Sequence, residues 1–329
     1  MEEKRASVVV IAEQGEDGIQ PVSLQLVGKA RQLADKLGSK VAAVVLGQKL
    51  TKAAEELVGA GADLVFQGDS DLLVPYQAEL YTEIIVKLMV EHCPDILLIG
   101  STFMGRELAP LVAARLKTGL TAHCIDLVIN SEGILEQKIP AYGGMITIVC
   151  PERRPQMATV ANGVFPNPVL DSARSGEIVP IHVPKELPLR VQTLETVKER
   201  SEGISLESAS VIVAGGAGAG DHDGWHHIAE LAEVLNAGLG ATRPAVDAGW
   251  TELETMIGQS GKMVSPEVYI GVGLSGELQH MVGIIGAKVM IAINNDARAP
   301  VFEQVDYGVV EDCRILVPAL VQALRNTLG

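Results

Sequence analysis

Short apolar runs alternate with amphipathic segments along the first half of the chain. The apolar runs have the length and composition of buried strands, and they are Val8–Ala12, Val41–Leu46, Asp63–Phe66 and Ile96–Gly100. Between them apolar residues recur at helical spacing, in residues 22–37, Lys52–Val58, Tyr76–Glu91 and Gly105–Leu116. Strands that alternate with helices at these intervals indicate βαβ units and a mostly parallel sheet.

The same alternation resumes in the last third of the chain. Strands are predicted at Val211–Ala214, Val268–Val272 and Val289–Ile293. Helices are predicted at Trp225–Leu235, Glu277–Ile284 and Ile315–Leu328. The fold class that follows is α/β, with two doubly wound domains, the C-terminal one built on a mostly parallel sheet.

A change of texture separates the two parts. Between about Leu170 and Ala209 prolines interrupt a charged stretch, whose last portion is strongly polar. Such a passage is typical of a connection between domains. We therefore expect an N-terminal α/β domain over 1–205, with a linker over about 170–208, and a second domain over 206–329.

Composition narrows the class of partner. The 329 residues are 47% apolar, and the net charge is −15. A chain this acidic repels phosphate backbones and anionic lipid, so nucleic acid and membrane surfaces are poor partners. No apolar run approaches the ~18 residues of a membrane span, and the run at Val8–Ala12 is too short for a signal peptide. We expect a cytoplasmic protein without stable membrane insertion.

Cysteine and histidine spacing does not favour a metal site. The four cysteines are widely spaced and contain no Cys-x-x-Cys pair, which argues against a disulfide framework and a zinc knuckle. His222 and His226 stand four residues apart, a spacing that zinc can use on a helix. The glycine and the acids beside them are more typical of a loop and a helix start, so we expect no metal there.

The strongest candidate site is the turn after the strand Val268–Val272. Gly273 and Gly276 allow the backbone to approach a pyrophosphate, and the Ser275 hydroxyl offers a hydrogen bond. The helix that follows adds free N–H groups and the positive end of its dipole, and His280 lies one turn into it. A plain strand-to-helix turn with a surface histidine fits the same residues, so both interpretations stay open here.

A second loop, Gly258–Lys262, holds Gln259 and Ser260 between glycines. Its similarity to a P-loop fails, because Met256 stands where the first glycine is needed and Met263 follows the lysine. A Walker-type NTPase is therefore not expected. An ordinary turn remains the alternative to a ligand-binding loop.

Arg243 lies at a predicted loop end, beside Thr242. Pro244 disfavours helix at Arg243 and suits the first turn of a helix that begins there. The guanidinium can therefore face a ligand or form a surface salt bridge. Asn294 and Asp312 also follow strand ends, where cap and turn roles are common.

The remaining glycine loop, Gly215–Gly220, does not match a known fingerprint. Gly-x-Gly-x-x-Gly fails because Asp221 or Asp223 occupies the third glycine position. A thiamine-diphosphate signature fails as well, since His222 follows Gly220-Asp221 and the Asn294-Asn295 pair is far too distant. This loop is a weak signal by itself.

Taken together, these loops resemble the FAD-binding domain of electron transfer flavoprotein alpha subunits. The matching segments are Gly240–Gly249, Gly258–Lys262, Pro266–His280, Ala292–Asn294, Ala299–Phe302 and Asp306–Gly308. The N-terminal half is also similar to that family, at Val10–Glu13, Asp95–Gly100, Gly105–Pro110 and Pro140–Gly144. The resemblance covers nearly the whole chain, and it implies a nucleotide-hydrolase-like fold for the N-terminal, subunit-pairing domain.

The resemblance implies an FAD site in the second domain. His280 would point to the flavin C2 carbonyl, Gln259 and Ser260 would lie at the ring with the hydroxyl near N5, and Arg243 would lie against the isoalloxazine face. Asn294 and Asp312 would engage the adenosine side. The full implied set is Thr242, Arg243, Ile257, Gly258, Gln259, Ser260, Gly261, Gly273, Ser275, Gly276, Glu277, Leu278, Gln279, His280, Asn294, Asp312 and Cys313.

The family also implies partners and a role. The chain would pair with an electron transfer flavoprotein beta subunit, accept electrons from flavin dehydrogenases such as acyl-CoA dehydrogenases, and pass them to another redox protein without independent catalysis. The beta subunit carries AMP in ordinary members and a second FAD in electron-bifurcating ones, and this chain does not distinguish the two kinds. Ala217 stands where the family usually has Arg, which puts one cofactor contact in doubt.

Two alternatives use the same residues differently. An enzyme that binds NAD or another nucleotide in the C-terminal crevice needs the same glycine turns. A ligand-free structural partner would use those turns only to connect strands and helices. Bound flavin would distinguish an electron carrier from the nucleotide-binding enzyme and from the ligand-free structural partner.

Overall fold

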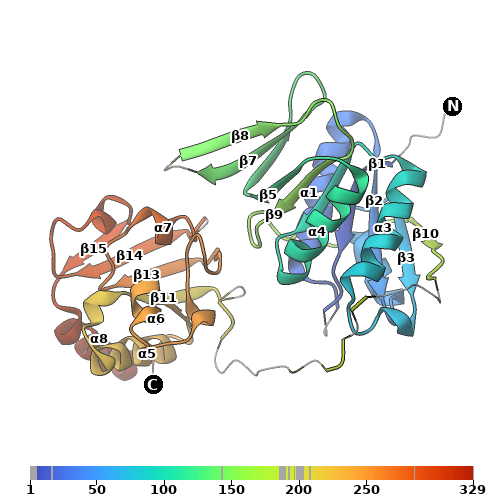
Figure 1. Cartoon of the computed structure of the whole chain (residues 1–329). Helices are drawn as coiled ribbons and strands as arrows, with labels where there is room; N and C mark the ends of the chain where they lie inside the picture. The colour runs from blue at the N-terminus through green and yellow to red at the C-terminus, as the bar shows by residue number, and fades with distance from the viewer. Residues whose placement is uncertain are drawn as a thin grey trace. The chain divides into compact units, whose positions relative to one another are not determined.

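The computed structural model describes residues 6–15, 18–141, 144–184, 190–191, 193–195, 197, 204–206, 209–284 and 286–328. The chain forms two compact units, Met1–Lys198 and Glu199–Gly329 (Figure 1). The division falls inside the stretch of about 170–208 where a linker was expected. Each unit has its own sheet and core, and each is described by itself.

The N-terminal unit is built on a seven-stranded sheet with the order β10-β3-β2-β1-β4-β9-β5. Every strand pair in it is parallel. The strands are β1 Ala6–Ala12, β2 Lys40–Gly47, β3 Leu64–Asp69, β4 Ile96–Gly100, β5 Leu120–Cys124, β9 Gln156–Val160 and β10 Glu177–Pro180. The helices are α1 Pro21–Leu37, α2 Thr51–Ala60, α3 Ala78–His92 and α4 Phe103–Leu116, with the short 3-10 helix η1 at Asp71–Leu73.

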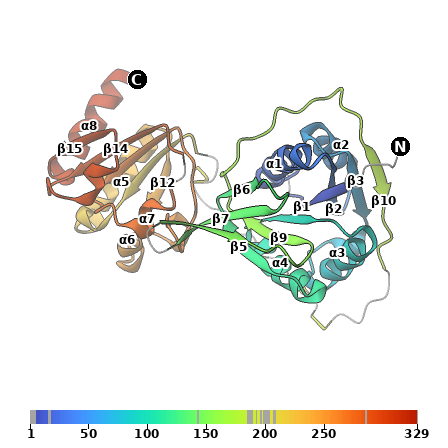
Figure 2. The same cartoon turned by 90° about the horizontal axis from the view of Figure 1, so that it is seen from above.

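Alternation along the strands explains the two layers of helices. In β1, Val8 and Val10 join the core under α1 and α2, whereas Val9 and Ile11 join the core under α3 and α4 (Figure 2). Successive strand side chains point to opposite faces, so a continuous apolar run is buried on both. β10 lies inside the stretch expected to be linker, and it forms the edge of this sheet.

A small antiparallel sheet in the same unit was not predicted from the sequence. It consists of β6 Asp126–Ile129, β7 Leu135–Ala141 and β8 Gly144–Val149. β8 is almost wholly exposed, and it extends with β7 beyond the seven-stranded sheet (Figure 1). Because neither face of β8 is buried, its sequence lacks the polar and apolar alternation that marks a half-buried strand.

The C-terminal unit is built on five parallel strands in the order β12-β11-β13-β14-β15. They are β11 Val211–Gly215, β12 Gly238–Ala241, β13 Val268–Val272, β14 Val289–Asn294 and β15 Tyr307–Val310. The helices are α5 His222–Val234, α6 Arg243–Asp247, α7 Leu278–Met281 and α8 Cys313–Leu328, with 3-10 turns η2 Ala217–Ala219, η3 Leu253–Thr255 and η4 Pro300–Glu303. The α/β class with doubly wound, mostly parallel sheets is therefore confirmed.

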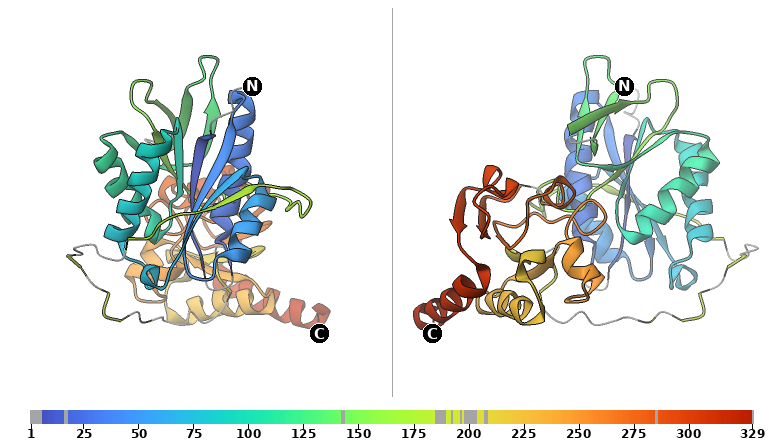
Figure 3. Two further views of the ribbon diagram at one scale, coloured as in Figure 1. Left: turned by 90° about the vertical axis from the view of Figure 1, so that its right-hand side faces the viewer. Right: turned by 60° about the vertical axis from the view of Figure 1, so that its left-hand side comes forward.

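The two faces of the second sheet are covered differently. α5 and α8 lie side by side against one face (Figure 3), where they enclose Val213, Ile270 and Ile293. The other face carries Tyr269 and Ala292, and loop residues such as Ile257 and Val301 cover it instead of long helices.

Candidate functional site

The two glycine turns of the C-terminal unit meet at the point where the strand order reverses. β11 has β12 on one side and β13 on the other, and the loops after β11 and β13 leave from this point. Gly216 N donates to Val272 O at 2.9 Å, and Gly218 N donates to Gly273 O at 2.8 Å. Open parallel sheets bind ligands at the carboxyl ends of strands beside such a reversal.

Glycine is required on both sides of this contact. A Cβ on Gly218 would lie 2.7 Å from the Cα of Gly273, closer than real Cβ contacts come. Gly273 has φ +61° and Gly276 has φ +84°, in the left-handed region that side chains disfavour. The turn after β13 is thus a narrow backbone shelf, free of side chains at Gly273 and Gly276, as an approaching pyrophosphate would need.

Backbone hydrogen bonds join the loop with Gln259 and Ser260 to α7 and to the end of β12. Gln259 N donates to Gln279 O at 2.7 Å, and Ile257 N donates to Ala241 O at 2.9 Å. A Cβ on Gly283 would overlap the backbone of Gly258, and a Cβ on Gly258 would overlap the carbonyl oxygen of Gln279. This close packing accompanies the early end of α7, which spans Leu278–Met281 rather than the predicted Glu277–Ile284.

His280 is almost fully enclosed between this loop and the sheet. Its side chain lies 2.6 Å from the Tyr269 hydroxyl through Nε2 and 3.0 Å from the Ile257 carbonyl oxygen through Nδ1. Burial lowers the pKa of His280 to about 4, and the bond to Ile257 opposes that shift only partly. The imidazole is therefore neutral at physiological pH.

Thr242 and Arg243 lie at the start of α6. Thr242 is the N-cap residue of α6, and its Oγ1 is buried without a hydrogen-bond partner in the described part of the chain. Arg243 is the first residue of α6, with Pro244 second, and its Nε lies 3.3 Å from an Asp247 carboxylate oxygen. Its side chain is 69% exposed, which leaves the guanidinium free to turn toward a ligand.

These loops enclose a cavity of about 580 Å³. The predicted residues that line it are Thr242, Arg243, Ile257, Gly258, Gln259, Ser260, Gly261, Gly273, Ser275, Gly276, Glu277, Gln279, His280 and Asn294. Three others do not line it: Leu278, Asp312 and Cys313. Cys313 lies just behind the wall, with its thiol 3.3 Å from the Gly218 carbonyl oxygen.

Several lining residues were not predicted. They are Ala217, Gly218, Pro244, Met256, Leu274, Asp296, Ala299 and Pro300. Pro244, Met256 and Leu274 lie directly beside predicted residues, so the continuity of those loops was the available signal. Asp296 adds a carboxylate beyond β14, and a carboxylate suits the hydroxyl groups of a ribose.

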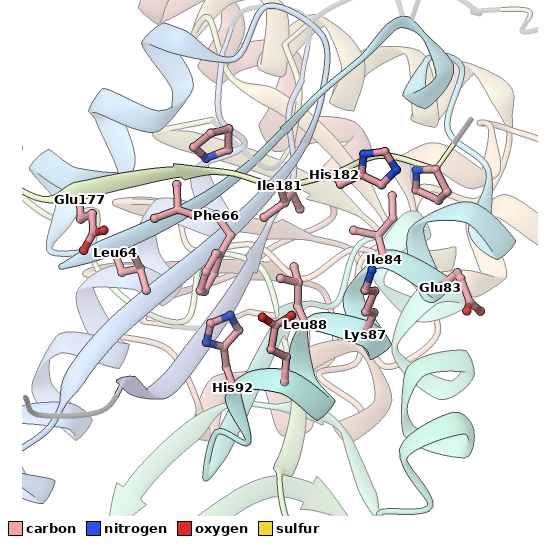
Figure 4. A pocket seen from close by; sticks show the side chains of 14 residues that line it. Leu64, Phe66, Glu83, Ile84, Lys87, Leu88, His92, Glu177, Ile181 and His182 are labelled. Carbon is pink, nitrogen blue, oxygen red and sulfur yellow. The ribbon is translucent and has the colours of Figure 1, made fainter. Parts of the chain in front are cut away.

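A second hollow, of about 600 Å³, lies in the N-terminal unit between α3 and the strands β3 and β10. Apolar side chains of β3 face α3 across it, with His92 and Lys87 at its border (Figure 4). Glu83, Glu91 and Glu177 outnumber its one lysine, and no glycine lines it. Without a glycine turn, this hollow lacks the exposed backbone that binds phosphate, whereas the C-terminal cavity has two such turns.

The residues of the C-terminal cavity fit a dinucleotide. The unpaired Thr242 hydroxyl calls for a polar ligand atom, because a buried hydroxyl without a partner costs free energy. The glycine shelf leaves space for a backbone-bound pyrophosphate, and the volume falls within the range of cofactor pockets. A doubly wound domain with such a cavity at its strand reversal defines a dinucleotide-binding protein.

Comparison with known proteins narrows that class. Residues 8–186 match the electron transfer flavoprotein domain, and residues 205–285 match the electron transfer flavoprotein FAD-binding domain. The chain is 41% identical over 320 residues to the electron transfer flavoprotein subunit alpha of Thermoanaerobacterium thermosaccharolyticum, covering 96% of this chain and 97% of that protein. It is 42% identical over 327 residues to protein FixB of Clostridium saccharobutylicum, with 98% and 97% covered. The chain belongs to the electron transfer flavoprotein family.

The family assignment confirms the resemblance and FAD as the cofactor of the second domain. A third relative, the electron transfer flavoprotein subunit alpha of Megasphaera elsdenii, is 38% identical over 328 residues, with 98% of this chain and 97% of that protein covered. In the part of the chain that the structure describes, every helix is too short or too polar to cross a bilayer.

Proposed function

We propose that the C-terminal cavity holds the FAD of an electron-carrying alpha subunit. The observation that carries this proposal is the buried Thr242 hydroxyl, which has no partner in the described part of the chain and belongs to a residue that lines the same cavity as the glycine turns, inside the segment matched to the FAD-binding domain. Bound flavin would supply the redox chemistry, and the protein would bind it, orient it and adjust its potential.

Each wall of the cavity has a separate task in this account. Gly273, Ser275 and Gly276 bind the pyrophosphate through backbone and hydroxyl groups. Gln259 and Ser260 lie at the ring on a loop that α7 holds in place. Asn294 and Asp296 lie beyond β14, on the side proposed for the adenosine portion.

Charge at the cavity favours the reduced ring. Arg243 is a permanent cation, and the amides of the loops add partial positive charge. His280 contributes no full charge, because burial keeps its pKa well below physiological pH. An added electron is therefore stabilised by one full charge and by fixed dipoles.

The partners are those that the family implies in general, a beta subunit and flavin dehydrogenases. We propose that acyl-CoA dehydrogenases are among the electron donors. Either an ordinary or an electron-bifurcating heterodimer is compatible with this chain. The FAD count per heterodimer distinguishes them, because one flavin marks an ordinary carrier and two mark a bifurcating one.

Arg243→Ala tests the electrostatic part of the proposal. Removing the cation disfavours negative charge on the ring, so we expect the first reduction potential to fall by tens of millivolts. A loss of ~1.4 kcal/mol in stabilisation of the reduced ring lowers a one-electron potential by about 59 mV. Spectroelectrochemical titration of the purified heterodimer measures this change.

Two matched variants separate a local effect from net charge. Asp247→Asn removes the carboxylate that lies 3.3 Å from the Arg243 Nε, and it should raise the potential. Arg325→Ala makes the same charge change as Arg243→Ala on α8, where the guanidinium pairs with Glu230, and should leave the potential unchanged. An unchanged or raised potential in Arg243→Ala would show that Arg243 does not stabilise the reduced ring.

A further inference from the structure

Tyr269 carries a hydroxyl into an otherwise apolar core. It lies on β13 with no exposed surface, among residues such as Ile212, Val264 and Ala292. The hydroxyl has one hydrogen-bond partner in the described part of the chain, His280 Nε2 at 2.6 Å. A phenylalanine would pack in the same core without the free-energy cost of burying a hydroxyl. The hydroxyl of Tyr269 therefore contributes through its hydrogen bond to His280.

The hydrogen bonds of His280 determine where its proton lies. The Ile257 carbonyl oxygen, 3.0 Å from Nδ1, can only accept a hydrogen bond, so Nδ1 carries a hydrogen. A neutral imidazole has one N–H, which leaves Nε2 as an acceptor. Tyr269 O–H therefore donates to Nε2, and the hydrogen on the imidazole is fixed at Nδ1.

The same bonds connect the sheet to the wall of the cavity. His280 and Ile257 both line the cavity, and Ile257 begins the loop with Gln259 and Ser260. In the other tautomer, a bare Nδ1 would face the Ile257 oxygen, and two lone pairs would repel each other at this distance. That tautomer would release the loop from the histidine.

We propose, on the basis that FAD occupies this cavity, that Tyr269 is a positioning residue for the flavin site. Its phenol donates to Nε2 and so stabilises the neutral ring, whose Nδ1–H donates to the Ile257 carbonyl oxygen. These two bonds hold the loop with Gln259 and Ser260 against α7. Tyr269 acts through His280 and does not line the cavity itself.

The state of His280 can be measured in the unmodified heterodimer. Long-range proton–nitrogen correlation spectra, with nitrogen-15 in the histidines, distinguish the two neutral tautomers from imidazolium. We expect His280 to have a pyrrole-type Nδ1 and a pyridine-type Nε2 at pH 7. A protonated ring, or hydrogen on Nε2, would overturn the proposal without any variant.

Tyr269→Phe tests the consequence for the flavin. Without the phenol, Nε2 loses its donor while Nδ1–H still faces the Ile257 oxygen, so we expect the Nε2 resonance to move toward that of an unbonded pyridine-type nitrogen in the same spectra. We also expect the equilibrium constant for uptake of the first electron to fall about tenfold, which corresponds to about 59 mV. FAD should remain bound, because no group that contacts it is removed.

Tyr81→Phe is the matched control. Tyr81 is buried in the N-terminal unit, where its hydroxyl lies 3.1 Å from Leu46 O and 3.2 Å from Leu73 O. This variant loses the same group and should lose stability, but it should keep the His280 Nε2 resonance and the flavin potential. If Tyr269→Phe holds FAD with an unchanged Nε2 resonance and potential, or if Tyr81→Phe shifts both equally, the role of Tyr269 is refuted. Loss of FAD from the unmodified heterodimer would instead refute the proposed function.

Discussion

Gly276 is constrained by both conformation and space. Its φ of +84° lies in the left-handed region, and a Cβ there would overlap the backbone of Val301. Val301 N also donates to Ser275 O at 2.9 Å, so η4 cannot move away without losing this bond. The glycine therefore fixes the distance between the turn after β13 and η4, two parts of the cavity wall.

Gly276→Ala should destabilise the second unit and weaken FAD binding. The left-handed conformation costs an alanine roughly 1–2 kcal/mol, and overlap with Val301 adds about 1–3 kcal/mol. Thermal unfolding and FAD retention during gel filtration measure both effects. Gly249→Ala is the control, because Gly249 has φ +74° with open space around it and does not line the cavity. Equal losses in the two variants would contradict a specific contact with Val301.

Among the residues that line the cavity, those that directly follow a buried strand could be predicted from the sequence. Gly273, Ser275 and Gly276 could be found because a buried strand ends in a glycine-rich turn. Tyr269 could not be found in this way, because it is one of several apolar residues in its strand. Its hydroxyl meets His280 only in the folded protein. Pro300 was missed for the same reason, because it reaches the cavity from a segment distant in sequence.

At the scale of elements, the end of β1 is joined to the start of α4 by a buried carboxyl group. Thr102 is the N-cap of α4, where its hydroxyl accepts from Gly105 N at 2.9 Å and donates to Glu13 at 2.6 Å. Glu13 is only 6% exposed. Burial raises the pKa of Glu13 to about 7, although the Thr102 hydrogen bond opposes the shift.

This raised pKa makes the first unit sensitive to pH. A folded-state pKa above the ordinary value of 4.5 means that the protonated carboxyl contributes stability below pH 4.5. That contribution is lost as pH rises through about 7. Glu13→Gln should therefore gain about 2 kcal/mol relative to the unmodified protein between pH 5 and pH 8. Urea unfolding at both pH values measures the difference.

Glu55→Gln is the control for this experiment. Glu55 is exposed on α2 in the same unit, and the substitution removes the same carboxylate. We expect its free energy of unfolding to follow that of the unmodified protein at both pH values. A Glu13→Gln variant that also follows it would mean that Glu13 ionises normally in the folded protein.

Element prediction succeeded for most of the central strands. β4 and β13 have the predicted bounds, and β1 and β2 agree within two residues. The strands that were missed are β5, β9, β10, β12, β15 and the antiparallel sheet β6–β8. β8 and β10 are exposed, and exposed strands carry little apolar signal, whereas β9 is buried but its sequence Gln-Met-Ala-Thr-Val is not a continuous apolar run. α7 was predicted too long, since the contact between Gly258 and Gly283 depends on tertiary structure.

At the scale of the whole molecule, the two compact units correspond to different family matches. The electron transfer flavoprotein domain lies within the first unit, and the FAD-binding domain lies within the second. All residues that line the C-terminal cavity come from the second unit. The FAD site that we propose is therefore lined by the C-terminal unit alone.

The most direct test is a crystal structure of the heterodimer grown with excess FAD. We expect the pyrophosphate at Gly273–Gly276, the ring between Arg243 and His280, and a polar flavin atom bonded to Thr242 Oγ1. A cavity that stays empty or filled by side chains while FAD is bound elsewhere would contradict the account.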